Sequence, residues 1–168
     1  SSDLSNRLSQ SGITFNINEM YIGTIHSICL RFLEEYREFT RLKRSYTLMD
    51  QFDQQYFIYQ QMKEFDSVLG IEHIAGNPDD ISRWKRSELI LKWVNKVSEE
   101  ALDVISLQLA PEPEVQALAH CYCKYEELLV QANALDFSTI QLEALHLLEN
   151  HPEVLEALRN KIKYIMID

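Results

Sequence analysis

Apolar side chains recur every three or four positions through most of this sequence, which is the spacing of helices with one buried face. The stripe is most regular between Val115 and Ala132, where it continues for roughly five turns. The pattern predicts a mainly α protein of about six helices. Shorter stripes with the same spacing lie in segments 25–39, 52–69, 89–97, 140–148 and 154–162.

Residues typical of helix starts and stops bound these stripes. Asp50 and Asp136 each stand before an apolar stripe, so both are predicted N-caps. Gly70 ends the stripe that follows Asp50, and Pro111 and Pro113 interrupt the chain before its most regular helix. With only 4 Gly and 4 Pro, the sequence has too few turn residues for an all-β fold.

Two segments depart from the helical spacing and favour short β-strands. Residues 20–26 form a brief β-favouring run directly before the first stripe, and residues 163–168 place four apolar residues before Asp168. Residues 1–19 are polar and predict a helix end followed by a loop. We therefore expect one helical domain over residues 20–168 with a strand near each end, both strands needing partners from outside this sequence.

The charge balance limits how the protein can meet nucleic acid. There are 26 acidic and 16 basic residues, a net charge of -10, which repels DNA at long range, so any DNA contact must be local. No apolar stretch approaches the roughly 20 residues of a membrane span, so we expect no membrane partner. The 3 cysteines follow no apolar leader and fit a reducing, cytoplasmic location.

One carboxylate stands where nucleotide-hydrolysing motors hold magnesium. Asp168 follows a predicted buried strand, and α/β motors use such an Asp to hold Mg²⁺ against nucleotide phosphates. The phosphate-binding loop Gly-x-x-x-x-Gly-Lys-Ser/Thr, whose bare amides and Lys hold the phosphates, does not occur in the sequence. We therefore expect no bound cofactor and no ATP hydrolysis from this chain alone.

Basic side chains gather in two places. Arg83, Lys85 and Arg86 flank Trp84, and cations next to an aromatic ring can hold duplex or single-stranded DNA. The competing interpretation is a solvated helix face, which the acidic surroundings favour. The second group contains Arg37, Arg41, Lys43 and Arg44.

Soft metal ligands are also present but are poorly spaced for zinc. His26 with Cys29, and His120 with Cys121 and Cys123, would supply enough ligands for one ion. Both groups fall in predicted helices rather than on the turns typical of zinc sites, so the favoured interpretation is three reduced cysteines, at least one of which fills the core.

Three segments, in order, resemble the UvrD/Rep/PcrA-type DNA helicases of superfamily 1. Residues 21–33 contain Gly-Thr-Ile-His-Ser, which is similar to the family's Gly-Thr-Phe-His-Ser block, with Ile25 in place of Phe. Residues 125–140 contain Ala-Leu-Asp-Phe, which resembles the family's Leu/Val-Asp-Phe element after a long helix. Residues 163–168 resemble the strand that enters the family's Asp-Glu-x-x-Gln-Asp motif, with Asp168 as the first Asp.

The resemblance implies a fragment of an ATP-dependent 3′-to-5′ DNA helicase: subdomain 1B, with residues 20–26 and 163–168 as strands of subdomain 1A. It implies that Thr24, His26 and Ser27 contact the backbone of single-stranded DNA, and that Asp168 binds Mg²⁺ in the complete enzyme. ATP and Mg²⁺ would be cofactors of that parent, with the phosphate loop upstream of Ser1. The implied partners are single-stranded and duplex DNA and the rest of the motor.

Two alternatives remain open at the level of sequence. Thr24 or Ser27 can simply cap the first helix, with His26 as a structural residue at the junction. The whole chain can also be a self-contained acidic helical module that binds a basic protein. Such a module gives no reason for the Gly-Thr-x-His junction or for the β-run that ends in Asp168.

Overall fold

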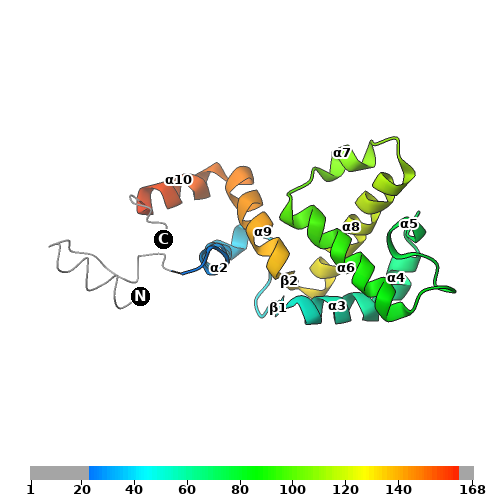
Figure 1. Ribbon diagram of the computed structural model, residues 1–168. Coiled ribbons are helices and arrows are strands. Elements are labelled where there is room, and N and C mark those ends of the chain that lie inside the picture. The colour runs from blue at the N-terminus through cyan, green and yellow to red at the C-terminus, as the bar shows by residue number, and fades with distance from the viewer. Residues whose placement is uncertain (1–22, 163–168) are drawn as a thin grey trace. The chain divides into compact units, whose positions relative to one another are not determined.

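The computed structural model describes residues 23–162, and this part of the chain is mainly helical (Figure 1). It divides into two compact units: residues up to Thr40 together with those from Glu143 onward, and residues 41–142. Within the described residues, no helix combines the length and the apolar character needed to cross a lipid bilayer. The predicted mainly α fold class is confirmed.

The first unit is built from short helices around a few apolar side chains. Leu33, Val154 and Leu158 are its buried aliphatic residues on α2 and α10. The ring of Phe39 lies 5.1 Å from that of His151 between centroids. The elements are α2 (Ile25–Glu35), the 3-10 helix η2 (Arg37–Phe39), the later part of α9 (Phe137–Asn150) and α10 (Pro152–Lys161).

The second unit holds the larger core. Its two longest helices, α6 and α8, pack against each other, α3 packs on α6, and α7 packs on α8. Between them lie fully buried side chains such as Ile58, Phe65, Ile90 and Tyr122. The helices are α3 (Gln51–Gln60), α4 (Met62–Asp66), α5 (Glu72–Ala75), α6 (Arg83–Glu99), α7 (Val104–Gln108) and α8 (Pro113–Ala132).

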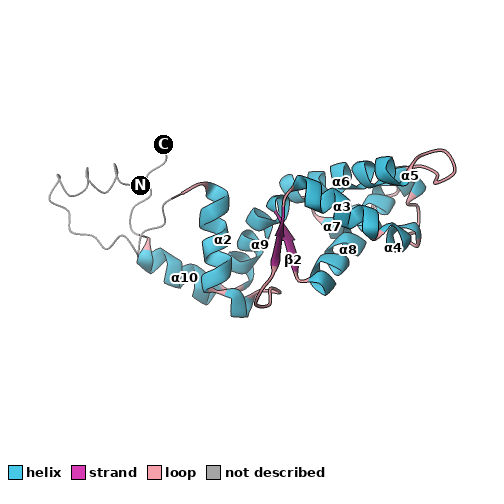
Figure 2. Ribbon diagram, turned by 90° about the horizontal axis from the view of Figure 1, so that it is seen from below, coloured by secondary structure: helices cyan, strands magenta, loops and turns pink. Residues whose placement is uncertain are grey.

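The second unit also contains a parallel two-stranded sheet that the sequence pattern did not predict. Strands β1 (Thr47–Met49) and β2 (Ala134–Asp136) pair in register, Thr47 opposite Ala134 (Figure 2). Each strand has only three residues, too few to show a period of two. The Arg41 Nη2 donates to the Ala134 carbonyl at 3.0 Å, so part of the second basic group supports this sheet.

The predicted strand over residues 20–26 is wrong at its end. Thr24 is the N-cap of α2 and Ile25 is already helical, because the Thr24 side chain accepts the Ser27 amide and starts the helix there. Residues 20–22 and the predicted strand 163–168 lie outside the described residues, as does the segment 1–19.

The structure confirms several of the predicted helix boundaries. Asp50 caps α3 in a capping box with Asp53, and α8 covers the most regular stripe. Asn133 ends α8 with a left-handed backbone, φ 48°. The stripe expected over residues 52–69 is divided: α3 ends at Gln60, and Gln61 separates it from α4.

Candidate nucleic-acid interface

The segment Gly23–Ser27 forms a closely bonded helix start. The Thr24 Oγ1 accepts the Ser27 amide at 3.2 Å, and the Ser27 Oγ donates to the Thr24 carbonyl at 2.8 Å. Gly23 has φ +150°, and a Cβ at this position would collide with the Ser27 hydroxyl. The backbone angle therefore favours glycine here, and a Cβ would also displace the Ser27 hydroxyl from its present position.

The same segment presents donors to solvent. Gly23, Thr24, His26 and Ser27 are all exposed, and the first turn of α2 contains no acidic residue. The first amides of a helix have no partner within the helix and favour a negative group. The structure thus brings the three predicted DNA-contacting residues together, and it also shows that Thr24 caps the helix.

The first turn of α6 carries two exposed cations. The Arg83 Nε donates to the Tyr59 carbonyl at 2.9 Å, and the Lys85 Nζ lies 3.1 Å from the Glu88 Oε2. The Ser82 side chain caps this helix by accepting the Lys85 amide. Arg83 and Lys85 thus stand on the surface at the start of a 17-residue helix.

Arg86 does not belong to this exposed group, which corrects the prediction that placed it there. Its side chain is 2% exposed, and the Nη1 lies 2.7 Å from the Asp66 Oδ1. The helical period explains the difference, since Arg86 shares the inward face of α6 with the fully buried Ile90 and Val94. Its charge is matched inside the protein and is not presented to DNA.

Asp136 is the buried polar centre of the second unit, a role beyond the N-cap that the sequence predicts. Its side chain is fully buried, and its Oδ1 accepts the Thr139 amide at 2.8 Å, which confirms the cap. Its Oδ2 accepts the Tyr125 hydroxyl and, at 3.3 Å, the Gln54 side-chain amide. Gln54 also donates to the Asn95 side chain at 2.6 Å.

Burial sets the ionisation of this network. It raises the pKa of Asp136, while hydrogen bonds from Tyr125 and Thr139 oppose the rise. Burial, together with the negative Asp136, raises the pKa of the Tyr125 hydroxyl well above its ordinary value. Tyr125 therefore remains a proton donor at neutral pH. No spacing rule links residues 54, 95, 125 and 136, so sequence reasoning had no signal for this cluster.

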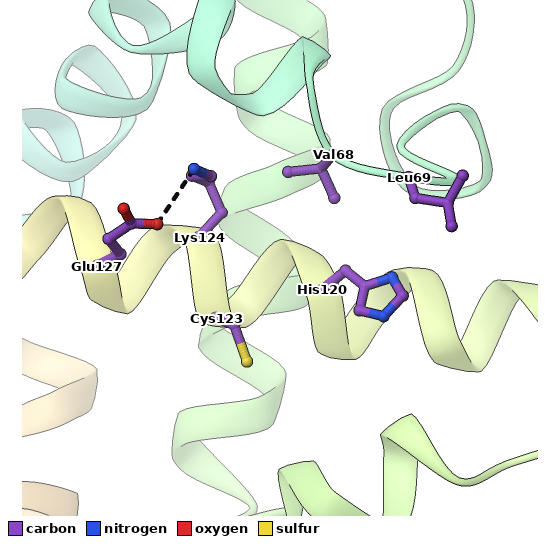
Figure 3. A pocket seen from close by; sticks show the side chains of 6 residues that line it. All are labelled: Val68, Leu69, His120, Cys123, Lys124 and Glu127. Carbon is purple, nitrogen blue, oxygen red and sulfur yellow. Dashed lines mark ion pairs between the residues drawn. The ribbon is translucent and has the colours of Figure 1, made fainter.

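A shallow hollow of about 380 Å³ lies beside α8 (Figure 3). Two of its lining residues on α8, Lys124 and Glu127, form an ion pair, with 3.1 Å between Nζ and Oε2. Burial raises the pKa of the Cys123 thiol, which makes the sulfur a poor nucleophile at neutral pH. The hollow is lined by Val68, Leu69, His120, Cys123, Lys124 and Glu127.

One cysteine of the described chain fits a packing role, whereas Cys29 and Cys123 are partly exposed. Cys121 is fully buried in α8, and burial raises its thiol pKa to about 12. Among residues 23–162, no three His, Cys, Asp or Glu side chains stand close enough together to hold a metal ion. Asp168, the predicted magnesium ligand, lies outside the described residues.

Comparison with known proteins gives consistent matches. The family model described as "UvrD/REP helicase N-terminal domain" matches residues 1–168. ATP-dependent DNA helicase PcrA of Staphylococcus aureus (strain Mu50) is 28% identical over 149 residues, which cover 89% of this chain and 19% of that protein. PcrA of Staphylococcus epidermidis (strain RP62A) matches with the same identity and coverage. The chain thus spans about a fifth of the length of these relatives.

Proposed function

Since the chain belongs to the UvrD/REP helicase N-terminal domain family, we propose that it is part of an ATP-dependent 3′-to-5′ DNA helicase. Within such an enzyme it would form the helical subdomain 1B, with residues 20–26 and 163–168 next to or within subdomain 1A. Its task would be to guide single-stranded DNA and to contact the duplex ahead of the motor. The similar PcrA proteins, which are ATP-dependent DNA helicases, support this assignment.

The start of α2 is the observation that carries the proposal. Thr24, His26 and Ser27 lie together on an exposed helix N-terminus without acidic residues in the first turn. Backbone amides, hydroxyls and an imidazole can all donate to a phosphate oxygen, which suits contact with a DNA backbone of any sequence. We assign this contact to the single strand.

Arg83 and Lys85 are the proposed contacts to duplex phosphates. Both are exposed at the start of α6, whereas Arg86 is buried against Asp66 and is left out. Two cations contribute modestly to affinity, and their contribution falls as salt concentration rises. This local contact is compatible with a net charge of -10.

ATP and Mg²⁺ would serve the complete helicase. The sequence lacks the phosphate-binding Gly-Lys loop, so its described residues do not form a nucleotide site by themselves. Asp168 is the residue of this chain that we assign to Mg²⁺, in a motor where the ion would neutralise nucleotide phosphates. The chain's own contribution is to hold DNA.

Thr24→Asp in the full-length protein tests the single-strand contact. Aspartate caps a helix as well as threonine does, but its charge repels phosphate. We expect the affinity for single-stranded DNA, measured by fluorescence anisotropy, to fall about tenfold. Thr24→Ser, which keeps the hydroxyl and the cap, is the matched control. If Thr24→Asp binds DNA like the parent protein, Thr24 is only a cap and the contact is wrong.

A further inference from the structure

Helices α3 and α6 pack side by side (Figure 2). Four aromatic side chains of α3 and the start of α6 contact one another there and form one surface. Phe52 is 65% exposed, Tyr56 48% and Trp84 39%. The ring centroids of Phe52 and Trp84 are 6.1 Å apart, and those of Tyr59 and Trp84 are 5.6 Å apart. Tyr56 stacks on Tyr59 at 6.3 Å. We call Phe52, Tyr56, Tyr59 and Trp84 the aromatic surface.

A guanidinium lies against this surface. The Arg83 Cζ is 4.3 Å from the centroid of the Tyr59 ring, and its Nε and Nη2 donate to the carbonyls of Tyr59 and Gln60. No carboxylate within residues 23–162 lies at ion-pair distance from Arg83. The guanidinium is thus held in place without neutralisation, and it keeps a positive charge next to the rings.

The acidic groups near the aromatic surface are engaged elsewhere. Glu88 pairs with Lys85 at 3.1 Å. Asp53, on the same helix as Phe52, accepts the Asp50 amide in the capping box of α3. Arg83 is the cation that contacts the rings, so a ligand that combines flat apolar faces with a negative group can use both features of this surface.

Packing among residues 23–162 does not account for the exposed rings. Tyr59 and Trp84 contact each other, but Phe52 keeps about two thirds of its surface in water, at 65%. Leaving a large apolar side chain in water forgoes the free energy that burial would give. Rings gathered in this way, with a fixed cation at their edge, are typical of a binding surface.

We propose that the aromatic surface stacks unpaired bases of DNA at the fork, with Arg83 and Lys85 against the phosphates of the same strand. The inference rests on the proposed function and refines it: the phosphates that Arg83 and Lys85 contact at the duplex end would belong to the strand that leaves the duplex at the fork, whose next bases are unpaired. Nucleobases offer flat faces and their phosphates offer charge, the combination that the surface requires.

Closed duplex does not satisfy the same surface. Its bases are stacked on one another and offer their faces only at an end, so a duplex would use the two cations and leave the rings in water. An apolar protein segment would cover the rings, but it would also desolvate the Arg83 charge without giving it an anion. Single-stranded DNA meets both needs.

The test compares two DNA substrates bound by the full-length protein without nucleotide. Both carry the same duplex with a single-stranded tail; one tail is thymidine and the other has abasic sites with the same phosphates. The parent protein should bind the thymidine tail about tenfold more tightly, because only that tail can stack. The double variant Phe52→Ala with Trp84→Ala should bring this ratio close to one, with little change in affinity for the abasic tail.

Two control variants identify the cause of any loss of preference for the thymidine tail. Phe52→Tyr with Trp84→Phe keeps ring faces and should keep the preference for the thymidine tail. Leu109→Ala removes an apolar side chain that is 80% exposed on the residue following α7, away from the rings in sequence, and should change nothing. A preference that survives in the alanine double variant overturns the inference. So does a variant that loses helicase activity while keeping the parent ratio, which would indicate a protein ligand.

A second set of variants tests the proposed function separately from the stacking inference. Arg83→Glu with Lys85→Glu, combined with Thr24→Asp, should weaken binding to both tails and reduce the dependence of affinity on salt. If this triple variant binds both substrates like the parent, the DNA-holding role is wrong whatever the tail ratio. If it weakens both but the parent shows no thymidine preference, only the stacking inference falls.

Discussion

Helices α2 and α9 begin with the same local cap in opposite surroundings. At α2 the Thr24 side chain accepts the amide of Ser27 at 3.2 Å, and at α9 the Asp136 side chain accepts the amide of Thr139 at 2.8 Å. In both, an oxygen of the first residue meets the amide three positions later. Thr24 is exposed, whereas Asp136 is fully buried.

The surroundings decide what each cap can do. An exposed hydroxyl exchanges its partners with water at little cost, so the start of α2 can give donors to a phosphate. A buried carboxylate must be satisfied within the protein, and Asp136 receives the Tyr125 hydroxyl and the Gln54 amide in addition to Thr139. We therefore expect changes at α9 to affect stability and changes at α2 to affect DNA binding.

Asp136→Ala should give the largest effect. The variant removes the cap of α9, leaves the buried Tyr125 hydroxyl without its acceptor and removes one acceptor of the Gln54 amide, so the free energy of unfolding should fall by about 3 kcal/mol. Urea unfolding followed by far-UV circular dichroism measures the loss. Asp136→Asn, which keeps a capping oxygen, should lose less. Equal losses in the two variants would show that the capping oxygen contributes little and that the loss comes from the contacts with Tyr125 and Gln54.

Tyr125→Phe should give the next largest effect. It keeps the ring in the core but removes one donor to the Asp136 carboxylate, and we expect a loss of about 1.5 kcal/mol in the same unfolding measurement. Tyr122→Phe is a comparison variant in the same helix, since the Tyr122 hydroxyl lies 3.1 Å from the Ser98 hydroxyl and also interacts with Glu126, which has no part in the Asp136 network. A smaller loss for Tyr125→Phe than for Tyr122→Phe would contradict the central place of Asp136.

Thr24→Ala should be mild for stability. The cap it removes is exposed, so α2 should lose about 1 kcal/mol or less. Because the change is local, amide hydrogen exchange of the first turn of α2 is the suitable measurement, and it should quicken there while exchange in α8 stays unchanged. Faster exchange in α8 as well, where Tyr125 contacts the Asp136 cap, would mean that the two caps are not independent.

The two caps also mark what sequence could predict. Asp50, Asp136 and the long helix α8 followed from local rules, because caps and apolar spacing act over a few neighbouring residues. The pairing of β1 with β2 and the contact of Gln54 with Asp136 join residues more than 80 positions apart, at 87 and 82. Such contacts depend on the tertiary arrangement, which no local pattern encodes.

The candidate site divides in the same way. The Gly-Thr-Ile-His-Ser block was recognised as a unit, and its geometry at α2 explains the glycine through the Ser27 hydroxyl. Arg86 was grouped with Arg83 and Lys85 because they are neighbours in sequence. In the helix, however, Arg86 lies on the buried face and pairs with Asp66. Phe52 and Trp84 come from different helices, so their shared surface emerged only in three dimensions.

The smallest expected effect is a pH dependence that separates the two caps. Because burial raises the pKa of Asp136 in the folded protein, the unfolded chain ionises this carboxyl first as pH rises from about 3. The folded state then binds more protons than the unfolded one, so the contribution of Asp136 to stability is greatest below its ordinary pKa and is lost as pH rises through the raised value. The difference in unfolding free energy between the parent and Asp136→Asn should therefore shift against the parent as pH rises from about 3 through the raised pKa of Asp136. For Thr24→Ala, where neither residue titrates, the difference from the parent should show no such trend of its own. A parent that gains on Asp136→Asn with rising pH would mean that hydrogen bonds, rather than burial, set the ionisation of Asp136.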